Sequence, residues 1–276
     1  LAEGRLVPGV DDFEGKLRSP AAAPLLGMIE SFTNALLLKR PKASHHTMVH
    51  NFLGAMDGPF RTHQLWARCD ESEMDDVLDA LEQRILGDER VCASVLAHMG
   101  GEWAQQDALF ERRAACLQFV QPEHLDMKRV HSHHPAMTLA RKMLLRVNAV
   151  HSPQEKLECV FRCARIIFRM LNETAAAERS QAASADDFLP LFIYTVLRSG
   201  ARQLHSNVEY ISLFRRPARL SGERYYYLVQ LQTAVTFIQH MDASSLSIEQ
   251  ADFDAKLAEA EARWAKRAGG GGPESP

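Results

Sequence analysis

Two adjacent carboxylates, Asp186 and Asp187, stand directly before an apolar stretch and are the first candidates for chemistry in this sequence. An aspartate at a helix start usually caps the helix by accepting backbone N–H bonds, and its charge interacts favourably with the helix dipole. Because two acids are present, a second interpretation stays open. One acid could cap the helix while the other points outward as a fixed negative charge. Taken alone, the residues favour a plain capping role for Asp186.

Histidine clusters are the other groups that could carry chemistry. His46 and His50 are four residues apart, so on a helix they share one face and could hold a metal ion. The stretch HTMVH lacks the acid that a HEXXH metalloprotease site needs. A second cluster lies in an expected loop and consists of His131, His133 and His134. Neither cluster has convergent acids or thiols, so we expect no metal site and no cofactor.

The five cysteines show no spacing typical of a disulfide framework or a zinc site, and their number is odd. Cys159 and Cys163 lie four residues apart, but no second pair completes a metal site. Buried free thiols in a reducing cytosol are the expected state.

The element that must position the two acids is an apolar helix immediately after them. Its apolar residues follow helical spacing and form one continuous face: Leu189, Phe192, Ile193, Val196 and Leu197. Pro190 restricts this helix, because proline has no N–H and is tolerated only in the first turn. The helix therefore begins at about Asp186 or later, or it bends at Pro190.

A second long helix is expected from Gly222 onward, and it carries two apolar stripes. One stripe consists of Leu228, Leu231, Val235 and Ile238. Tyr226, Val229 and Thr233 fall nearly opposite. One stripe can face the core, so the other must be covered by a neighbouring helix or by a partner. Tyrosine suits a partner surface because it combines a large rigid ring with a polar tip. Taken alone, the pattern slightly favours a helix that is buried all round.

The remaining chain also reads as helical. Amphipathic stretches are expected at 25–38, 48–56, 73–86, 90–98, 102–119 and 137–147, and no stretch alternates with period two. Ser152-Pro153-Gln154-Glu155 is a helix start, with Ser as N-cap, Pro at N1 and Glu at N3. A flexible connector is expected at 173–183. We predict an all-α protein with these parts: a weakly ordered segment with one short helix at most (1–24), a helical bundle (25–150), a functional domain (151–253), a C-terminal helix (254–268) and a disordered tail (269–276).

Charge and hydropathy exclude some partners. The net charge of −3 and the isoelectric point of about 6.5 do not favour nucleic acid or an anionic membrane as the main partner. No apolar run reaches the ~18 residues that a transmembrane helix needs. The sequence begins with Leu rather than Met, so the completeness of its N-terminus, and any lost targeting segment, stays open.

Several separate motifs resemble one known family. SADDFLPLFIY, HSNVEYISLFR and SGERYYYLVQLQTAVTFI, followed by DASSLSIEQADFD, are similar to the vacuolar-protein-sorting-nine (Vps-nine) domain. The resemblance spans about Ser152 to Phe253 in register. The earlier stretches MVHNFLGAMDGPFRTHQLW, the acidic helix ending LEQRI, and LQFVQPEHLD resemble the helical bundle that precedes this domain in its plant-type members. Family members are guanine-nucleotide exchange factors for early-endosomal Rab-five-class small GTPases.

The resemblance implies roles for particular residues. Asp186 matches an acidic finger that enters the nucleotide pocket of the GTPase, and Pro190 matches the proline that sets the finger's direction. Tyr226 matches a tyrosine that packs on the apolar switch regions, and Thr233 lies on the same stripe. The family usually has Thr where this chain has Val229, and Gly where it has Tyr225. Asn207 belongs to a matching Ser-Asn pair; a surface or loop-bracing role and simple capping of the next helix are equally open for it.

The resemblance further implies a non-enzymatic activator that uses no cofactor, acts in the cytoplasm and is bound peripherally on early endosomes. Its partner is a Rab-class GTPase in the GDP-bound or nucleotide-free form, with no nucleic acid and no transmembrane segment. Two rival interpretations stay open. One is a non-catalytic helical adaptor or effector that binds an active GTPase, or a degenerate exchange factor. The other is a metal hydrolase that uses the histidine clusters.

Overall fold

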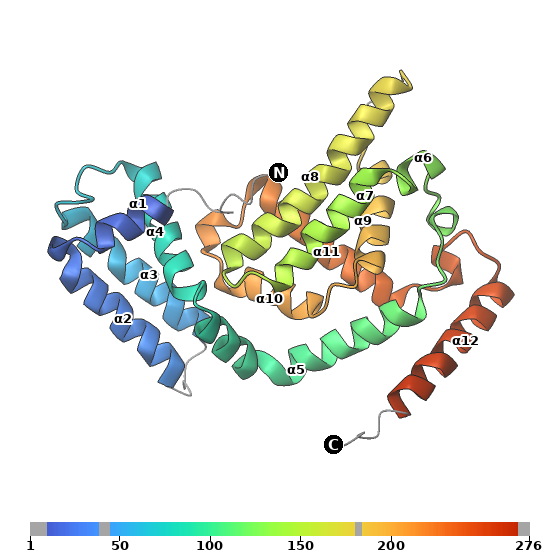
Figure 1. The fold of residues 1–276 in the computed structure, drawn as a ribbon, viewed down its shortest axis with the longest axis horizontal. Helices are drawn as coiled ribbons and strands as arrows, with labels where there is room; N and C mark the ends of the chain where they lie inside the picture. Colours follow the sequence, from blue (N-terminus) through green and yellow to red (C-terminus); the bar gives the residue numbers. More distant parts are fainter. Residues whose placement is uncertain (1–9, 39–44, 180–183, 270–276) are drawn as a thin grey trace. The chain divides into compact units, whose positions relative to one another are not determined.

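The structure is a computed structural model that describes residues 10–38, 45–179 and 184–269, and every regular element in these ranges is a helix (Figure 1). The predicted all-α class is confirmed. Cα packing divides the chain into two units. Unit 1 takes its residues from Leu1–Gly101, Ala149–Glu158 and Glu209–Gly222. Unit 2 takes them from Glu102–Asn148, Cys159–Val208 and Glu223–Pro276.

Unit 1 contains the N-terminal helices α1 (Val10–Leu17), α2 (Ala23–Leu38), α3 (His45–Thr62) and α4 (Glu71–Leu86). An aromatic cluster joins α1, α3 and the segment after α3: the ring of Phe13 lies 5.8 Å from that of Phe60, which lies 5.0 Å from that of Trp66. All three side chains are buried. The segment expected to be weakly ordered with one short helix at most thus contains α1, which packs through Phe13 and Leu17; residues 1–9 lie outside the described ranges.

A buried ion network ties α4 to the segment after α10 (Leu204–Phe214), again within unit 1. The Arg215 guanidinium donates to Asp79 at 2.9 Å and to Glu82 at 3.0 Å, and all three side chains are buried. Arg219 pairs with Asp79 at 2.8 Å. Such a network is strongly destabilised when one partner is removed, because a buried charge is left uncompensated. The network therefore fixes the chain between α10 and α11.

Unit 2 holds the two helices that the sequence analysis singled out. They are α9 (Ala185–Ser199) and α11 (Gly222–His240), accompanied by α6 (Arg129–Ser132), α7 (Pro135–Leu145) and α12 (Gln250–Gly269). α5 (Glu89–Cys116), α8 (Pro153–Ala177) and α10 contribute residues to both units. α7 packs along α9 (Figure 1). Aromatic rings of α8, α9 and α11 contact one another within this unit.

Some helix limits differ from the predicted ones. The stretches expected at 90–98 and 102–119 form one continuous helix, α5, which runs through Gly100 and Gly101. α8 extends to Ala177, so the first part of the expected connector is helical, and residues 180–183 lie outside the described ranges. The predicted start of α8 is confirmed, since Ser152 Oγ accepts the Glu155 N–H at 3.2 Å. The C-terminal helix is α12, and the tail after it is likewise not described.

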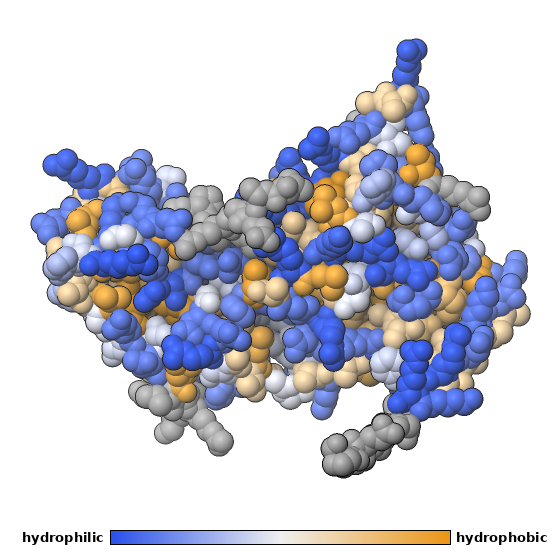
Figure 2. Space-filling view, viewed as in Figure 1, coloured by the Kyte–Doolittle hydropathy of each residue, from blue (hydrophilic) through white to orange (hydrophobic). Residues whose placement is uncertain are grey.

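The division into units does not follow a single point in the chain, because residues 149–158 and 209–222 group with the N-terminal helices. The sequential boundary near residue 150 stays a prediction. Among the described helices, none has both the length and the apolar character of a membrane span. The face seen in Figure 2 is mostly hydrophilic, with apolar side chains in small groups among charged ones.

Candidate functional site

The start of α9 is fixed by a reciprocal capping box. Ser184 is the N-cap, and its hydroxyl oxygen accepts the backbone N–H of Asp187 at 3.2 Å. The Asp187 carboxylate accepts two bonds in return, from the Ser184 backbone N–H at 2.9 Å and from its hydroxyl at 2.7 Å. These hydrogen bonds hold the pKa of Asp187 below its usual range. Asp187 is therefore the acid engaged in capping.

Asp186 is the second residue of α9, and its side chain is exposed. Within the described part of the chain, its carboxylate makes no hydrogen bond or ion pair, in contrast to its neighbour Asp187. Neither acid is the N-cap: Asp187 completes the capping box from position N3, and the Asp186 carboxylate makes no hydrogen bond within the described residues. The capping residue itself is Ser184, which the sequence analysis missed although the pattern S-x-x-D was a signal for it.

Pro190 is the sixth residue of α9 and half-buried, and the helix continues through it. Because proline has no N–H, it cannot donate to the carbonyl of the residue four positions earlier, which is Asp186. The helix starts at Ala185, close to the expected position. The backbone of Asp186 is thus less constrained by the helix than that of an ordinary second residue.

α11 presents the two predicted stripes on opposite faces. Leu228, Leu231 and their partners Val235 and Ile238 are buried, with at most 4 % of their surface exposed. On the other side, Tyr226 is 44 % and Val229 37 % exposed, and Thr233 is exposed as well. The Thr233 hydroxyl donates to the Val229 carbonyl at 2.9 Å. The second stripe is not covered by any described part of this chain, and Tyr225, at 42 % exposure, widens it.

A ring contact joins the starts of α9 and α11. The buried ring of Phe188, two residues after Asp186, lies 5.5 Å from that of Tyr227. The Tyr227 ring in turn meets the exposed ring of Tyr226 at 5.2 Å. Burial raises the pKa of Tyr227. The start of α9, which carries Asp186, and the start of α11, which carries the exposed stripe, are therefore packed together within unit 2.

Asn207, the remaining candidate residue, lies inside the first turn of α10 and is buried, with 3 % exposure. Its side-chain amide donates to the Gln203 carbonyl at 2.8 Å, where the backbone is left-handed with φ 54°. Its neighbour Ser206 bonds through both its backbone N–H and its hydroxyl to Asp107. This geometry suits bracing of the turn before α10 and not direct contact with a partner; the role stays a prediction.

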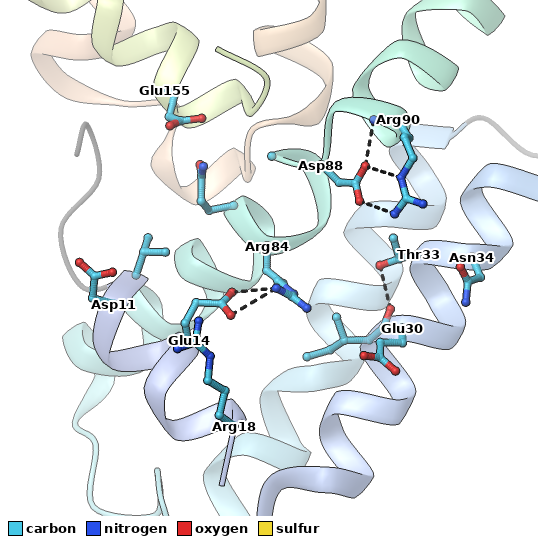
Figure 3. Close-up of a pocket in the computed structure, with 14 residues that line it drawn as sticks. Asp11, Glu14, Arg18, Glu30, Thr33, Asn34, Arg84, Asp88, Arg90 and Glu155 are labelled. Carbon is cyan, nitrogen blue, oxygen red and sulfur yellow. Dashed lines mark hydrogen bonds and ion pairs between the residues drawn. The ribbon is translucent and has the colours of Figure 1, made fainter. Parts of the chain in front are cut away.

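Other features of the described chain do not converge on a second site of this kind. No group of three or more His, Cys, Asp or Glu side chains among the described residues is arranged to hold a metal ion. A cavity of about 700 Å³ lies in unit 1, and Figure 3 shows that Glu14 and Arg84, and also Asp88 and Arg90, pair with each other at its walls. Four of the charged side chains that line the cavity are thus paired with one another.

Comparison with known proteins places these residues in a family. Residues 137–243 match the vacuolar sorting protein 9 (VPS9) domain. The chain belongs to the VPS9-domain family. The matched range contains the whole candidate site: Asp186, Pro190, Asn207, Tyr226, Val229 and Thr233.

Two relatives match the chain beyond the limits of this domain. Vacuolar protein sorting-associated protein 9A of Arabidopsis thaliana is 32% identical over 256 residues, which cover 92% of this chain and 49% of that protein. The Rab5 GDP/GTP exchange factor of Homo sapiens is 32% identical over 186 residues, covering 66% of this chain and 36% of that protein. The longer plant match includes most of the N-terminal helices. The chain spans about half or less of the length of these relatives.

Proposed function

We propose that this VPS9-domain chain is a guanine-nucleotide exchange factor for a Rab-five-class small GTPase, and that it acts in endosomal transport from the cytoplasmic side, held peripherally on early endosomes. The observation that carries the proposal is the exposed, unpaired carboxylate of Asp186, set at a fixed helix start beside an exposed aromatic stripe. The names of the mammalian relatives, Rab5 GDP/GTP exchange factors, support the choice of partner.

In the proposed mechanism, the Asp186 carboxylate enters the nucleotide pocket of the GTPase. There it repels the β-phosphate, competes for the phosphate-loop lysine and disfavours Mg²⁺. Charge–charge repulsion is strongest where water is excluded, as in a closed protein–protein contact. A ~10⁴-fold faster release of GDP corresponds to about 5.5 kcal/mol of barrier lowering, which one well-placed charge and contacts to the switch regions can supply together.

The stripe of α11 supplies the binding energy for that contact. Tyr226, Val229 and Thr233 present an aromatic ring and two β-branched side chains, which suit the apolar switch residues of a GTPase. Val229 lacks the hydroxyl of the usual threonine but keeps a β-branched shape. The stripe is thus expected to hold the GTPase in place while Asp186 acts on its nucleotide, so the two elements contribute differently to affinity and to rate.

Binding of GDP and binding of this chain must oppose each other. If the exchange factor weakens GDP binding to the GTPase, GDP weakens binding of the exchange factor by the same factor. The nucleotide-free GTPase is therefore the form that should bind most tightly. An adaptor or effector would instead prefer the GTP-bound form, so a comparison of affinities for the two forms separates these functions.

Substitution of Asp186 by Ala tests the proposal directly. We expect Asp186→Ala to abolish most of the acceleration of GDP release and to leave the thermal midpoint of unfolding unchanged, because the side chain is exposed and has no partner among the described residues. Stopped-flow release of a fluorescent GDP from a Rab-five-class GTPase measures the rate.

Asp252→Ala is the matched control, since Asp252 is also an exposed acid in the first turn of a helix of unit 2, α12. This variant should keep the wild-type rate. An unchanged release rate in Asp186→Ala would refute the role of Asp186.

A further inference from the structure

We propose that Ser184 and Asp187 are positioning residues for Asp186, and that the rate of nucleotide exchange depends on the capping box that they form. This inference rests on the proposed exchange function. It assigns a positioning role to residues that do not themselves reach the nucleotide. The box consists of three hydrogen bonds between Ser184 and Asp187, with lengths of 2.7, 2.9 and 3.2 Å.

Asp186 lies between two fixed points of the chain. Before it, the capping box ties Ser184 to Asp187. After it, the side chain of Phe188 is buried against α8 and α11, with its ring 6.3 Å from that of Phe168 and 5.5 Å from that of Tyr227. The proline at position 190 provides no N–H for the Asp186 carbonyl. The orientation of the first turn therefore depends on the box more than it would in a helix with a complete set of backbone bonds.

The box also gives the two carboxylates different environments. Two donors of Ser184 engage the Asp187 carboxylate, and Lys128 and His131 lie near enough to favour its ionised form further. Asp186 is thus left as the acid that faces outward without a partner among the described residues. Without the box, the first turn of α9 would fray and Asp187 would become a second free carboxylate beside Asp186.

Two variants and one rescue test the proposal on the full chain. Ser184→Ala and Asp187→Ala each remove two of the three bonds of the box, and we expect the plateau rate of GDP release to fall by roughly 3- to 10-fold, a factor that corresponds to the free energy of a typical helix cap. The concentration of exchange factor that gives half the plateau rate should change little, because the stripe on α11 is untouched. Asp187→Glu, in contrast to Asp187→Ala, should keep the plateau rate near that of the wild type, since glutamate is the usual residue at this place in a capping box.

The chain offers a matched control for a purely structural effect. α4 in unit 1 starts with the same kind of box, in which Asp70 accepts the Glu73 N–H at 2.9 Å and Glu73 accepts the Asp70 N–H at 2.9 Å. Glu73→Ala should lower the thermal midpoint about as much as Asp187→Ala and leave the plateau rate unchanged.

The outcomes separate this inference from the proposed function. Equal plateau rates in Asp187→Ala and wild type, together with loss of exchange in Asp186→Ala, would overturn the positioning role alone. A plateau rate that falls equally in Asp187→Ala and Glu73→Ala would also overturn it, because lost stability would then explain the change. If Asp186→Ala exchanges normally, the role proposed for Asp186 fails, and the positioning role fails with it. If the wild-type chain does not accelerate GDP release, the proposed exchange function itself fails.

Discussion

Tyr226 and Tyr227 are neighbours with opposite environments, and this contrast allows the proposed partner binding to be tested separately from folding at the level of single residues. Tyr226 is 44 % exposed, whereas Tyr227 is 5 % exposed and packs against rings of α8 and α9. On a helix, adjacent side chains point about 100° apart, so one can belong to a surface while the next belongs to the core. The same aromatic residue type therefore lies in the surface and in the core at consecutive positions.

We predict that Tyr226→Ala weakens binding of the nucleotide-free GTPase by about 2 kcal/mol, the loss typical of a central aromatic contact, with little change in stability. Tyr227→Ala provides the contrast, because removal of a buried aromatic ring costs about 3 kcal/mol or more of unfolding free energy. Isothermal titration of the GTPase and thermal melting of both variants measure the two effects. A melting loss in Tyr226→Ala as large as in Tyr227→Ala would place Tyr226 in the core and contradict its assignment to a partner surface.

At the level of elements, α9 contains a proline where a helix normally avoids one. Pro190 lies past the first turn, and its missing N–H leaves the Asp186 carbonyl without that intrahelical bond. Because proline in a helix interior is costly, a conformational requirement at Asp186 would explain why it stands here.

We predict that Pro190→Ala raises the unfolding free energy by about 1 kcal/mol or more, since it can restore the missing hydrogen bond. The same change should lower the plateau rate of GDP release, because the first turn of α9 then adopts regular helix geometry and redirects Asp186. Urea unfolding and stopped-flow exchange on the same preparation test the two halves. A variant that is more stable and exchanges at the wild-type rate would show that the proline has no part in directing Asp186.

The two helices of the site could be predicted from the periodicity of their apolar residues, whereas the extent of α5 could not. The two opposite stripes that contain Leu228 and Tyr226 follow from helical spacing. Spacing alone does not decide whether a neighbouring helix covers Tyr226, and the structure shows that it is exposed. The continuity of α5 does not follow from spacing, because Gly100 and Gly101 each cost about 1 kcal/mol in helix propensity and favour a break. Buried side chains on both sides of the glycines, among them Val95 and Trp103, offset that cost by tertiary packing that the local sequence does not show.

At the level of the whole chain, the ion network of unit 1 joins residues that are distant in sequence. Arg215 and Glu82 are 133 positions apart, and no local pattern relates them. Burial raises the pKa of Glu82 to about 7, although Arg215 acts in the opposite direction. One carboxylate oxygen of Glu82 has no hydrogen-bond partner among the described residues, which agrees with incomplete compensation of its charge.

The raised pKa of Glu82 predicts how stability depends on pH. Because the folded chain binds this proton more tightly than the unfolded chain does, the free energy of unfolding falls as pH rises from the ordinary value of 4.5 to about 7. Between about pH 5.5 and about pH 7.5 the loss should be about 2 kcal/mol. Urea unfolding at the two pH values, for the wild type and for Glu82→Gln, isolates this contribution from that of the histidines. Equal pH slopes in the two proteins would mean that Glu82 does not titrate in this range.

The meeting of the Phe188 and Tyr227 rings has one more consequence. The distance between Asp186, the proposed acidic finger, and the proposed GTPase-binding stripe depends on the packing of the Phe188 and Tyr227 side chains between α9 and α11. Substitution of Phe188 by a smaller apolar residue would reduce the distance between the starts of α9 and α11 without altering any atom that is proposed to contact the GTPase. Natural variation in catalytic efficiency or partner choice within such proteins could thus arise from interior volume, at positions that a survey of the contact surface would never include.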